Sequence, residues 1–231
     1  MQEDRKLFYA VRDALKAIDK QAQHFRDYRV ESKQSHQGLL SKRKVPLRRP
    51  SQLHMTAFSD CYVISETLPA WHVVAAVQAL GASLLGQGIL CRGAIVKGAA
   101  YHRSRVLFGP AVIEAYELES QVAKYPRILV TEEVRKTVWG YHEGLWRGRL
   151  FLQDSDGCWF VNLLTPSMSK WKALSNAGLE SSSRKFLNTV RKRINRELAN
   201  AQGDVRHLSK LRWLRHHFNR VAKQKGIDLI E

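Results

Sequence analysis

The stretch LHMTAFSDCYVIS, residues 53–65, decides the fold. β-branched and aromatic residues cluster on either side of Ser59 and Asp60, which is typical of two short strands joined by a turn. The sequence therefore predicts a β-hairpin with Asp60 at or next to its turn. A carboxylate there can accept hydrogen bonds from nearby backbone N–H groups. It can also bind a hard divalent cation such as Mg²⁺ or Mn²⁺ together with phosphate oxygens of a substrate.

Helices and strands alternate after this hairpin. The expected elements are a helix over 71–85, a central strand in the apolar run 88–96, a loop at YHRSR (101–105), a helix that opens at Pro110 and runs through Val122, a strand at 128–130, a helix capped by Thr131, and a hairpin over 149–164. An amphipathic helix is expected within residues 3–25. The sequence thus predicts a mixed α/β core over residues 1–165.

Positive charge is concentrated in two segments outside that alternation. The chain of 231 residues has 38 Lys and Arg against 21 Asp and Glu, a net charge of +17. Residues 26–50 hold eight basic residues, two acids and no periodicity, so we expect a mobile basic loop. Residues 166–231 are predicted to form a basic helical extension. This charge favours polyanions, which include nucleic acid, nucleotide phosphates and anionic lipid, without choosing among them.

The composition favours a cytoplasmic protein. Cys61, Cys91 and Cys158 each lie in an apolar stretch without metal-ligand spacing, which is typical of buried thiols in a reducing compartment. The first residues include two acids before any apolar run, so we expect no secretory signal. The uncharged stretch 67–91 is interrupted by Pro69 and by several polar residues and glycines, so no membrane span is expected.

Four cations surround the expected central strand. In LCRGAIVKGAAYHRSR, residues 90–105, Arg92, Lys97, Arg103 and Arg105 alternate with a strand and glycines. Cationic side chains at a strand end can bind phosphates, and glycine lets the backbone approach them closely. The simpler alternative is a strand with solvated charges beside it.

The motifs occur in an order that resembles one known family. They are FSDCYVIS (58–65), RGAIVKGAAYH (92–102), FGPAVIEAYELESQVAKYPRILV (108–130) and a hairpin ending in WFVNLL (159–164). Over roughly residues 53–165 the chain resembles the Pycsar pyrimidine nucleotide cyclases, bacterial anti-phage enzymes related to class III adenylate and guanylate cyclases. The resemblance implies a ferredoxin-like α+β core. It also implies a homodimer, because two copies of that core pair head to tail with an active site at each seam.

The resemblance implies a reaction and its residues as well. Nucleoside triphosphate binds with two divalent metal ions, Mn²⁺ or Mg²⁺, the ribose 3′-hydroxyl attacks the α-phosphorus, and pyrophosphate leaves. Asp60 matches the second of the family's two metal-binding aspartates. Thr56 stands where purine cyclases read the base with a lysine, and its small hydroxyl favours a pyrimidine. Ser59 and Arg92 are assigned to substrate binding.

The chain departs from the family pattern at two places. The family's first metal-binding aspartate lies on an opening strand with a pattern like D-x-x-G-F, and this sequence has no such strand before its first helix. Either about 20 residues precede Met1, or the metal is held differently. Where class III cyclases present an asparagine and an arginine to the transition state, this chain has Ile113 and Glu117. Catalytic charge stabilisation is therefore assigned to Lys97, Arg103 and Arg105.

The resemblance implies that UTP is converted to cyclic UMP, which activates a separate effector protein. Alternatives are a cytidylate cyclase, a non-catalytic protein with the same fold, and a basic nucleic-acid-binding module. Nucleic acid is not an expected partner, because no helix-turn-helix, zinc-finger or RNP-type motif is present. Membrane is not expected either.

Overall fold

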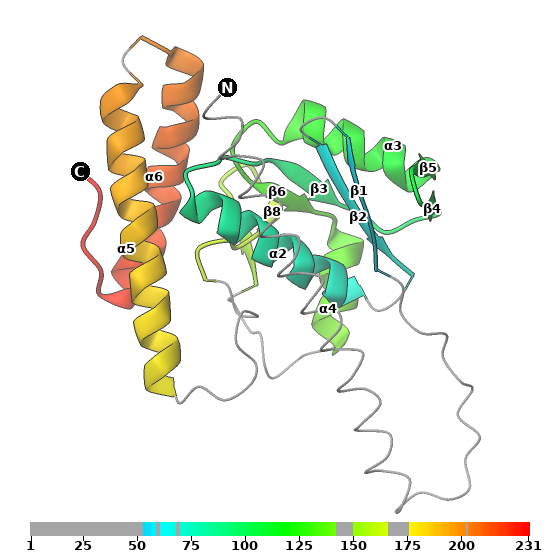
Figure 1. The fold of residues 1–231 in the computed structure, drawn as a ribbon, viewed down its shortest axis with the longest axis horizontal. Coiled ribbons are helices and arrows are strands. Elements are labelled where there is room, and N and C mark those ends of the chain that lie inside the picture. Colours follow the sequence, from blue (N-terminus) through cyan, green and yellow to red (C-terminus); the bar gives the residue numbers. More distant parts are fainter. Residues whose placement is uncertain (1–52, 59–60, 68–69, 142–149, 166–175, 202) are drawn as a thin grey trace, which may run out of the picture.

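The computed structural model describes residues 53–58, 61–67, 70–141, 150–165, 176–201 and 203–231 (Figure 1). The helix and the loop predicted within residues 3–50 lie outside the described residues, as do Ser59 and Asp60. Helices and strands are mixed along the described chain, so the predicted α+β class is confirmed. The finer ferredoxin-like arrangement stays a prediction.

The strands within the described residues form three sheets (Figure 1). Their bounds are β1 Leu53–Phe58, β2 Cys61–Glu66, β3 Gly93–Ile95, β4 Tyr101–Arg103, β5 Val106–Phe108, β6 Ile128–Val130, β7 Phe151–Gln153 and β8 Trp159–Val161. β1 and β2 form the predicted antiparallel hairpin, with Phe58 opposite Cys61. The largest sheet has the order β3-β6-β8-β7, in which β3 and β6 run parallel and the other pairs antiparallel.

The helices follow the apolar spacing that predicted them. Their bounds are α2 Ala70–Gly86, α3 Pro110–Glu117, a π-helical turn η1 Leu118–Val122, α4 Glu132–Tyr141, α5 Asn176–Asn200 and α6 Val205–Lys225. Pro110 occupies the first turn of α3, where its missing N–H is harmless. The Thr131 hydroxyl oxygen accepts a hydrogen bond from the Val134 N–H at 3.5 Å, which confirms the predicted cap of α4.

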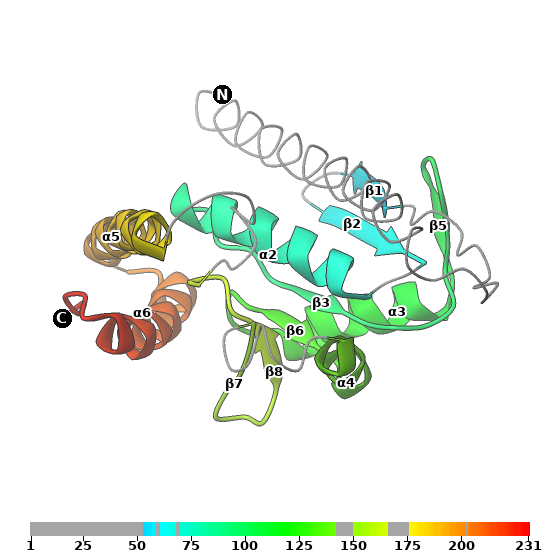
Figure 2. The same ribbon diagram turned by 90° about the horizontal axis from the view of Figure 1, so that it is seen from below.

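The four-stranded sheet is covered on both faces, since all three residues of β6 are buried. Ile128 and Val130 belong to the main hydrophobic core with α2 and α4, whereas Leu129 packs in a separate cluster that includes Phe160. Figure 2 shows α2 lying along one face of β3 and β6. A Cβ atom at Gly81 would lie 2.8 Å from Leu163 Cδ2, so a larger residue in this part of α2 would have to displace the Leu163 side chain.

The hairpin of α5 and α6 packs onto the same core. Leu187, Val190 and Ile194 of α5 and Leu214 and Phe218 of α6 belong to the main hydrophobic cluster. Figure 1 places the two helices at one end of the molecule and β4 and β5 at the other. The division of the chain at residue 165 stays a prediction from composition.

Two segments differ from the expected strands and loops. The apolar run 88–96 forms a strand only over β3, and β3 lies at the edge of the described four-stranded sheet instead of its centre. Gly88 has a φ of 86° and the Ile89 N–H donates to the Leu84 carbonyl, so the chain is still closing α2 where the strand was expected to start. The expected loop 101–105 instead forms β4 and the turn into β5.

The cysteines also differ from the expectation. Cys61 is exposed, while Cys91 and Cys158 are only partly buried. Cys61 is the first residue of β2 and its only exposed residue. Burial raises the pKa of the Cys91 thiol to about 11, which keeps it protonated. No described helix combines the length and the hydropathy needed to cross a bilayer.

Candidate functional site

The two faces of the β1–β2 hairpin differ in chemistry. Tyr62 and Ile64 pack against the buried side of α2. Side chains alternate along a strand, so Thr56 and His54, two residues apart, lie on one face of β1. Ser65 stands directly opposite His54 in the register. This second face carries the polar side chains His54, Thr56 and Ser65 and contacts β4.

Three side chains from different strands form a continuous hydrogen-bonded chain on that face. The Thr56 hydroxyl donates to the Ser104 carbonyl at 2.7 Å, and Thr56 Oγ1 lies 2.7 Å from His102 Nε2. A hydroxyl has a single hydrogen, so His102 Nε2 carries the proton and donates to Thr56. His102 Nδ1 then accepts from the Ser65 hydroxyl, also at 2.7 Å. We call Thr56, Ser65 and His102 the hairpin bridge.

The hairpin bridge holds a neutral imidazole. Burial lowers the pKa of His102, and the nearby His54 lowers it further when charged. The two rings lie 5.7 Å apart between centroids. His102 is itself 8% exposed, so the bridge fixes the β4–β5 hairpin against β1 and β2 and does not present an imidazole to solvent.

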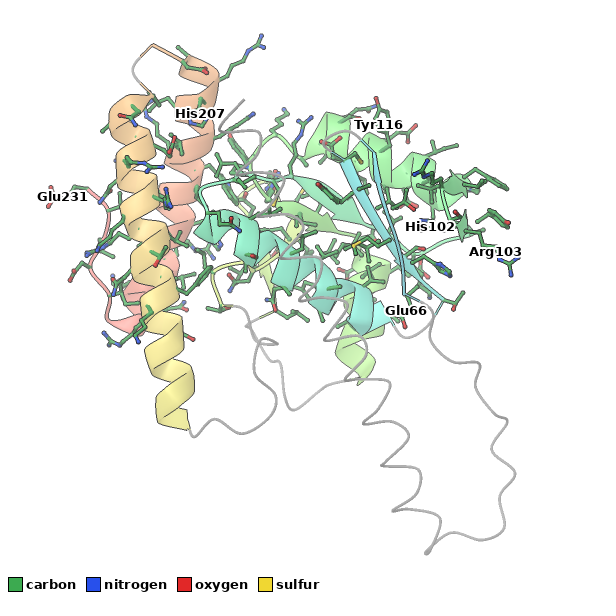
Figure 3. The ribbon with its side chains drawn as sticks, in the orientation of Figure 1. Glu66, His102, Arg103, Tyr116, His207 and Glu231 are labelled. Carbon is green, nitrogen blue, oxygen red and sulfur yellow. The ribbon has the colours of Figure 1, made fainter. Side chains whose placement is uncertain are left out.

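The bridge places two arginines at the tip of the β4–β5 hairpin. Ser104 lies between Arg103 and Arg105 and has a φ of 53°, in the left-handed region that non-glycine residues rarely adopt. Its carbonyl is the acceptor for the buried Thr56, so β1 fixes the turn. Both arginines are exposed, and neither forms an ion pair with another described residue. Figure 3 shows Arg103 projecting outward from the edge of the molecule.

Gly109 connects this hairpin to α3. It has a φ of 132°, and a Cβ atom there would lie 2.7 Å from the Ala99 carbonyl oxygen. The Ala111 N–H donates to that same carbonyl at 3.2 Å. Only glycine allows this approach, which holds the start of α3 beside the segment that follows β3.

The other two predicted cations pair with acids. Lys97 Nζ lies 2.8 Å from Glu133 Oε1 of α4, and Arg92 Nε lies 2.5 Å from Glu119 Oε1 of η1. Lys97 follows β3 and Arg92 precedes it, so they stand at opposite ends of that strand. The lysine pair is half-exposed and contributes little to stability, which leaves Lys97 able to exchange its partner for a phosphate.

The structure thus brings together part of the predicted site. Thr56 joins Arg103 and Arg105 through Ser104, whereas Arg92 faces η1 and Lys97 faces α4. Sequence reasoning assigned no role to His102 or Ser65. The only signal for them was a histidine and a serine within the quoted motifs, because their partners lie 46 and 37 residues away in the chain.

Metal ligation can be judged only for the described residues. Among them, no group of three or more His, Cys, Asp or Glu side chains is arranged to hold a metal ion. The proposed ligand Asp60 and its neighbour Ser59 lie outside that part of the chain. Comparison with family models, curated proteins and solved structures finds no match for this chain.

An exposed apolar surface lies next to the arginines. It consists of the side chains Tyr101, Val106, Phe108, Ile113 and Tyr116, which are 44–69% exposed and come from β4, β5 and α3. Tyr101 and Phe108 stack with centroids 5.0 Å apart. We call these five residues the apolar patch. Exposed apolar side chains on neighbouring elements are typical of a protein interface when they form one surface.

Proposed function

We propose that the protein is a metal-dependent pyrimidine nucleotide cyclase of the cytoplasm that converts UTP to 3′,5′-cyclic UMP and pyrophosphate. In this proposal cyclic UMP is an anti-phage signal that activates a separate effector. The proposal rests on the motif resemblance and on one structural observation. The hairpin that leads to Asp60 is fixed by Thr56 to the turn carrying Arg103 and Arg105.

That observation bears on phosphate chemistry. Arginine binds phosphate oxygens with paired N–H donors, and two arginines without acidic partners among the described residues are free to do so. Because the Ser104 carbonyl between them is fixed by a buried hydroxyl, the backbone that carries both arginines is in place before substrate arrives. Preorganised cations of this kind stabilise charge that develops in a transition state.

In the proposed reaction the ribose 3′-oxygen forms a bond to the α-phosphorus and the bond from that phosphorus to the β-phosphate bridging oxygen breaks. The 3′-hydroxyl proton is lost to solvent, and pyrophosphate takes the electron pair of the broken bond. Arg103 and Arg105 bind the oxygens that gain charge, and Lys97 adds a third cation from the end of β3. A divalent ion, with Asp60 as its proposed ligand, would lower the pKa of the nucleophile and neutralise the leaving group.

Thr56 can contact a base only as a hydrogen-bond acceptor. Its hydrogen is donated to Ser104, and one acceptor position is used by His102. The remaining lone pair can accept a hydrogen bond, which the N3–H of uracil or the exocyclic amine of cytosine can donate. The N–H groups of adenine and guanine can donate to it as well, so this lone pair does not choose among bases. The preference for a pyrimidine comes from the resemblance, and CTP is the alternative substrate.

The proposed enzyme acts as a homodimer through the apolar patch. The patch is bordered by Arg103 and Arg105 on the hairpin and by Glu114 and Glu117 on α3, all exposed. In a two-fold dimer one surface meets itself, so it must be complementary to its own copy. A surface with apolar side chains and both signs of charge meets that requirement.

The test is incubation of purified protein with each of the four nucleoside triphosphates and Mn²⁺, followed by mass analysis for the 3′,5′-cyclic product. We expect cyclic UMP from the wild type and none from Asp60→Asn. The double variant Arg103→Gln with Arg105→Gln should lose about 100-fold or more in rate. Lys136→Gln, which removes a similarly exposed cation from α4, should keep the wild-type rate.

Each alternative predicts a different result. Cyclic CMP from CTP in place of cyclic UMP would identify a cytidylate cyclase. If no triphosphate yields a cyclic product, the enzymatic proposal is wrong. Turnover by Asp60→Asn at the wild-type rate would remove the metal role given to that residue.

A further inference from the structure

Helix α6 has a cationic face that is separate from the candidate site. Its buried face consists of Leu211, Leu214, His217, Phe218, Val221 and Ala222, which pack on the core and on α5. On the opposite side Arg212, His216, Arg220 and Lys223 follow one another at intervals of four, four and three residues and are all exposed. Such intervals place side chains in one line along a helix. We call these four residues the outer row.

The outer row has defined borders. On one flank, Asn219 and Arg215 are engaged by the C-terminal segment, because Asn219 bonds to Ile230 and Arg215 donates to the Glu231 carbonyl. On the other flank, Trp213 Nε1 donates to Asp154 at 2.8 Å. The row is therefore a strip of solvent-facing surface between two packed edges.

Three of the four acidic side chains in this part of the chain are already engaged. Within residues 183–231 the acids are Glu197, Asp204, Asp228 and Glu231. Glu197 contacts Arg196, Asp204 caps α6 and Asp228 pairs with Arg191. Asp154 and Asp156 of the core both bind the buried Arg127. No ion pair within the described residues neutralises Arg212, Arg220 or Lys223.

Helix α5 provides an internal comparison. Its exposed cations are Arg184, Lys185, Lys192 and Arg196. Arg184 donates to the Lys225 carbonyl, Asn and Thr side chains lie between Lys185 and Lys192, and Arg196 contacts Glu197 at 3.2 Å. The cationic line on α5 is therefore interrupted and partly neutralised. The line on α6 holds two arginines and a lysine without acidic partners among the described residues, with His216 between the arginines.

We propose that the outer row of α6 binds the phosphate backbone of double-stranded nucleic acid without sequence specificity. The row spans eleven residue steps, or about 17 Å at 1.5 Å per residue. A duplex carries roughly one phosphate per 1.7 Å of axis, so about ten phosphates lie within that length. The two arginines and the lysine of the row lie along one straight helix, so they are complementary to so dense and regular a line of charge.

Other polyanions fit this surface less well. Single strands are held by exposed aromatic side chains on which bases stack. The exposed aromatics of the described chain, Tyr101, Phe108 and Tyr116, lie on β4, β5 and α3, at the far end from α6 (Figures 1 and 3). A membrane-surface helix inserts an apolar face, but the apolar face of α6 is buried in the core.

This placement makes nucleic-acid binding compatible with the proposed enzyme. The outer row and the hairpin bridge lie at opposite ends of the molecule, so a bound duplex leaves the arginine turn open (Figure 1). The inference does not depend on the cyclase proposal, because its measurement is binding and not turnover.

The test is a fluorescence anisotropy titration of full-length protein with a labelled 30-base-pair duplex over a range of salt concentrations. The test variant is Arg212→Gln with Arg220→Gln. The matched control is Lys124→Gln with Lys136→Gln, which removes two exposed cations that lie outside the helical extension. Losing two phosphate contacts should reduce the slope of log affinity against log salt by about 1.8, or roughly 60-fold in affinity at 0.1 M salt.

Equal binding by the test variant and the wild type would overturn the proposal, and so would an equal loss in the control, because the effect would then follow net charge alone. Binding to vesicles containing 30% phosphatidylserine, without binding to the duplex, would also overturn it. Both variants change exposed side chains, so an unchanged thermal midpoint will show that each is folded.

Discussion

Thr56 joins β1 to β4 and to the turn that follows β4 through one hydroxyl group. Replacing it with Val keeps the shape but leaves the His102 Nε2–H and the Ser104 carbonyl without their partner. Unpaired groups in a buried place cost about 1–3 kcal/mol in total. We expect Thr56→Val to lower the free energy of unfolding by that amount in urea. Thr56→Ser keeps the hydroxyl and should lose less; equal losses in the two variants would contradict the role of the hydrogen bonds.

His217 gives the protein a pH-dependent stability. It packs edge-on against Phe160, with centroids 5.2 Å apart, and its Nδ1 has no hydrogen-bond partner among the described residues. Burial lowers the pKa of His217 from 6.5 to about 3, and the positive charge of Arg220 lowers it as well. Between those pH values the unfolded chain binds a proton that the folded chain does not.

The unfolding free energy should therefore fall as the pH is lowered from 6.5 toward 3, by up to about 1.4 kcal/mol per pH unit. Above pH 6.5 His217 is neutral in both the folded and the unfolded chain, so the stability is at its full value with respect to this group. We expect His217→Leu to show a flatter dependence between pH 7 and 5 in urea titrations. A variant with the wild-type slope would mean that His217 is not the group responsible.

At this scale the sequence indicated which residues were unusual but not what they contact. Thr56 was recognised from its place four residues before Asp60, yet its contacts with His102 and Ser104 connect residues 46 and 48 apart. Local patterns carry no information on such pairs. Asp60 itself lies outside the described residues, so its metal role rests on the sequence alone.

Periodic elements were predictable at the scale of helices and strands, and short irregular ones were not. Helix α2 and strand β6 followed directly from apolar spacing. The β4–β5 hairpin was missed because its strands have three residues each and its turn contains Ser104 at positive φ, where glycine or asparagine is the usual signal. The apolar run before β3 was read as strand, although the end of α2 extends into it.

The turn between β7 and β8 depends on a buried cation. Arg127, whose side chain is 1% exposed, binds Asp154 at 2.5 Å and also binds Asp156. Asp154 in turn accepts from Trp213 of α6, so the arginine connects the sheet to the helical extension. Hydrogen bonding to Arg127 lowers the pKa of Asp156 to about 2.

Arg127→Met should destabilise the fold by on the order of 3 kcal/mol, because the largely buried Asp154 would lose its counter-charge. Arg196→Met removes an exposed pair on α5 and should change stability by less than about 1 kcal/mol. Chemical denaturation of both variants measures the difference. Similar small losses would mean that Arg127 is not needed to hold the turn.

On the scale of the whole molecule, composition separated a basic extension from the core, but it could not show how the two pack. The main hydrophobic cluster includes Val74 and Val161 as well as Val190 and Phe218. Residues far apart in the chain thus share one interior. Burial of this kind depends on tertiary packing, which a local count of charges does not report.

The last prediction concerns association of two copies through the apolar patch. Phe108 is 60% exposed and stacks on Tyr101 within the apolar patch. If the patch is buried in a dimer, a charge at residue 108 loses its contact with water, which is costly. We expect the wild type to sediment at twice the chain mass of 26.5 kDa and Phe108→Asp at the chain mass. Leu229→Asp, an equally drastic change at an apolar residue that is 51% exposed near the opposite end, should remain a dimer. If Leu229→Asp dissociates while Phe108→Asp does not, the interface lies on the helical extension. Because both substitutions add one negative charge to an exposed site, any difference between them reports position and not net charge.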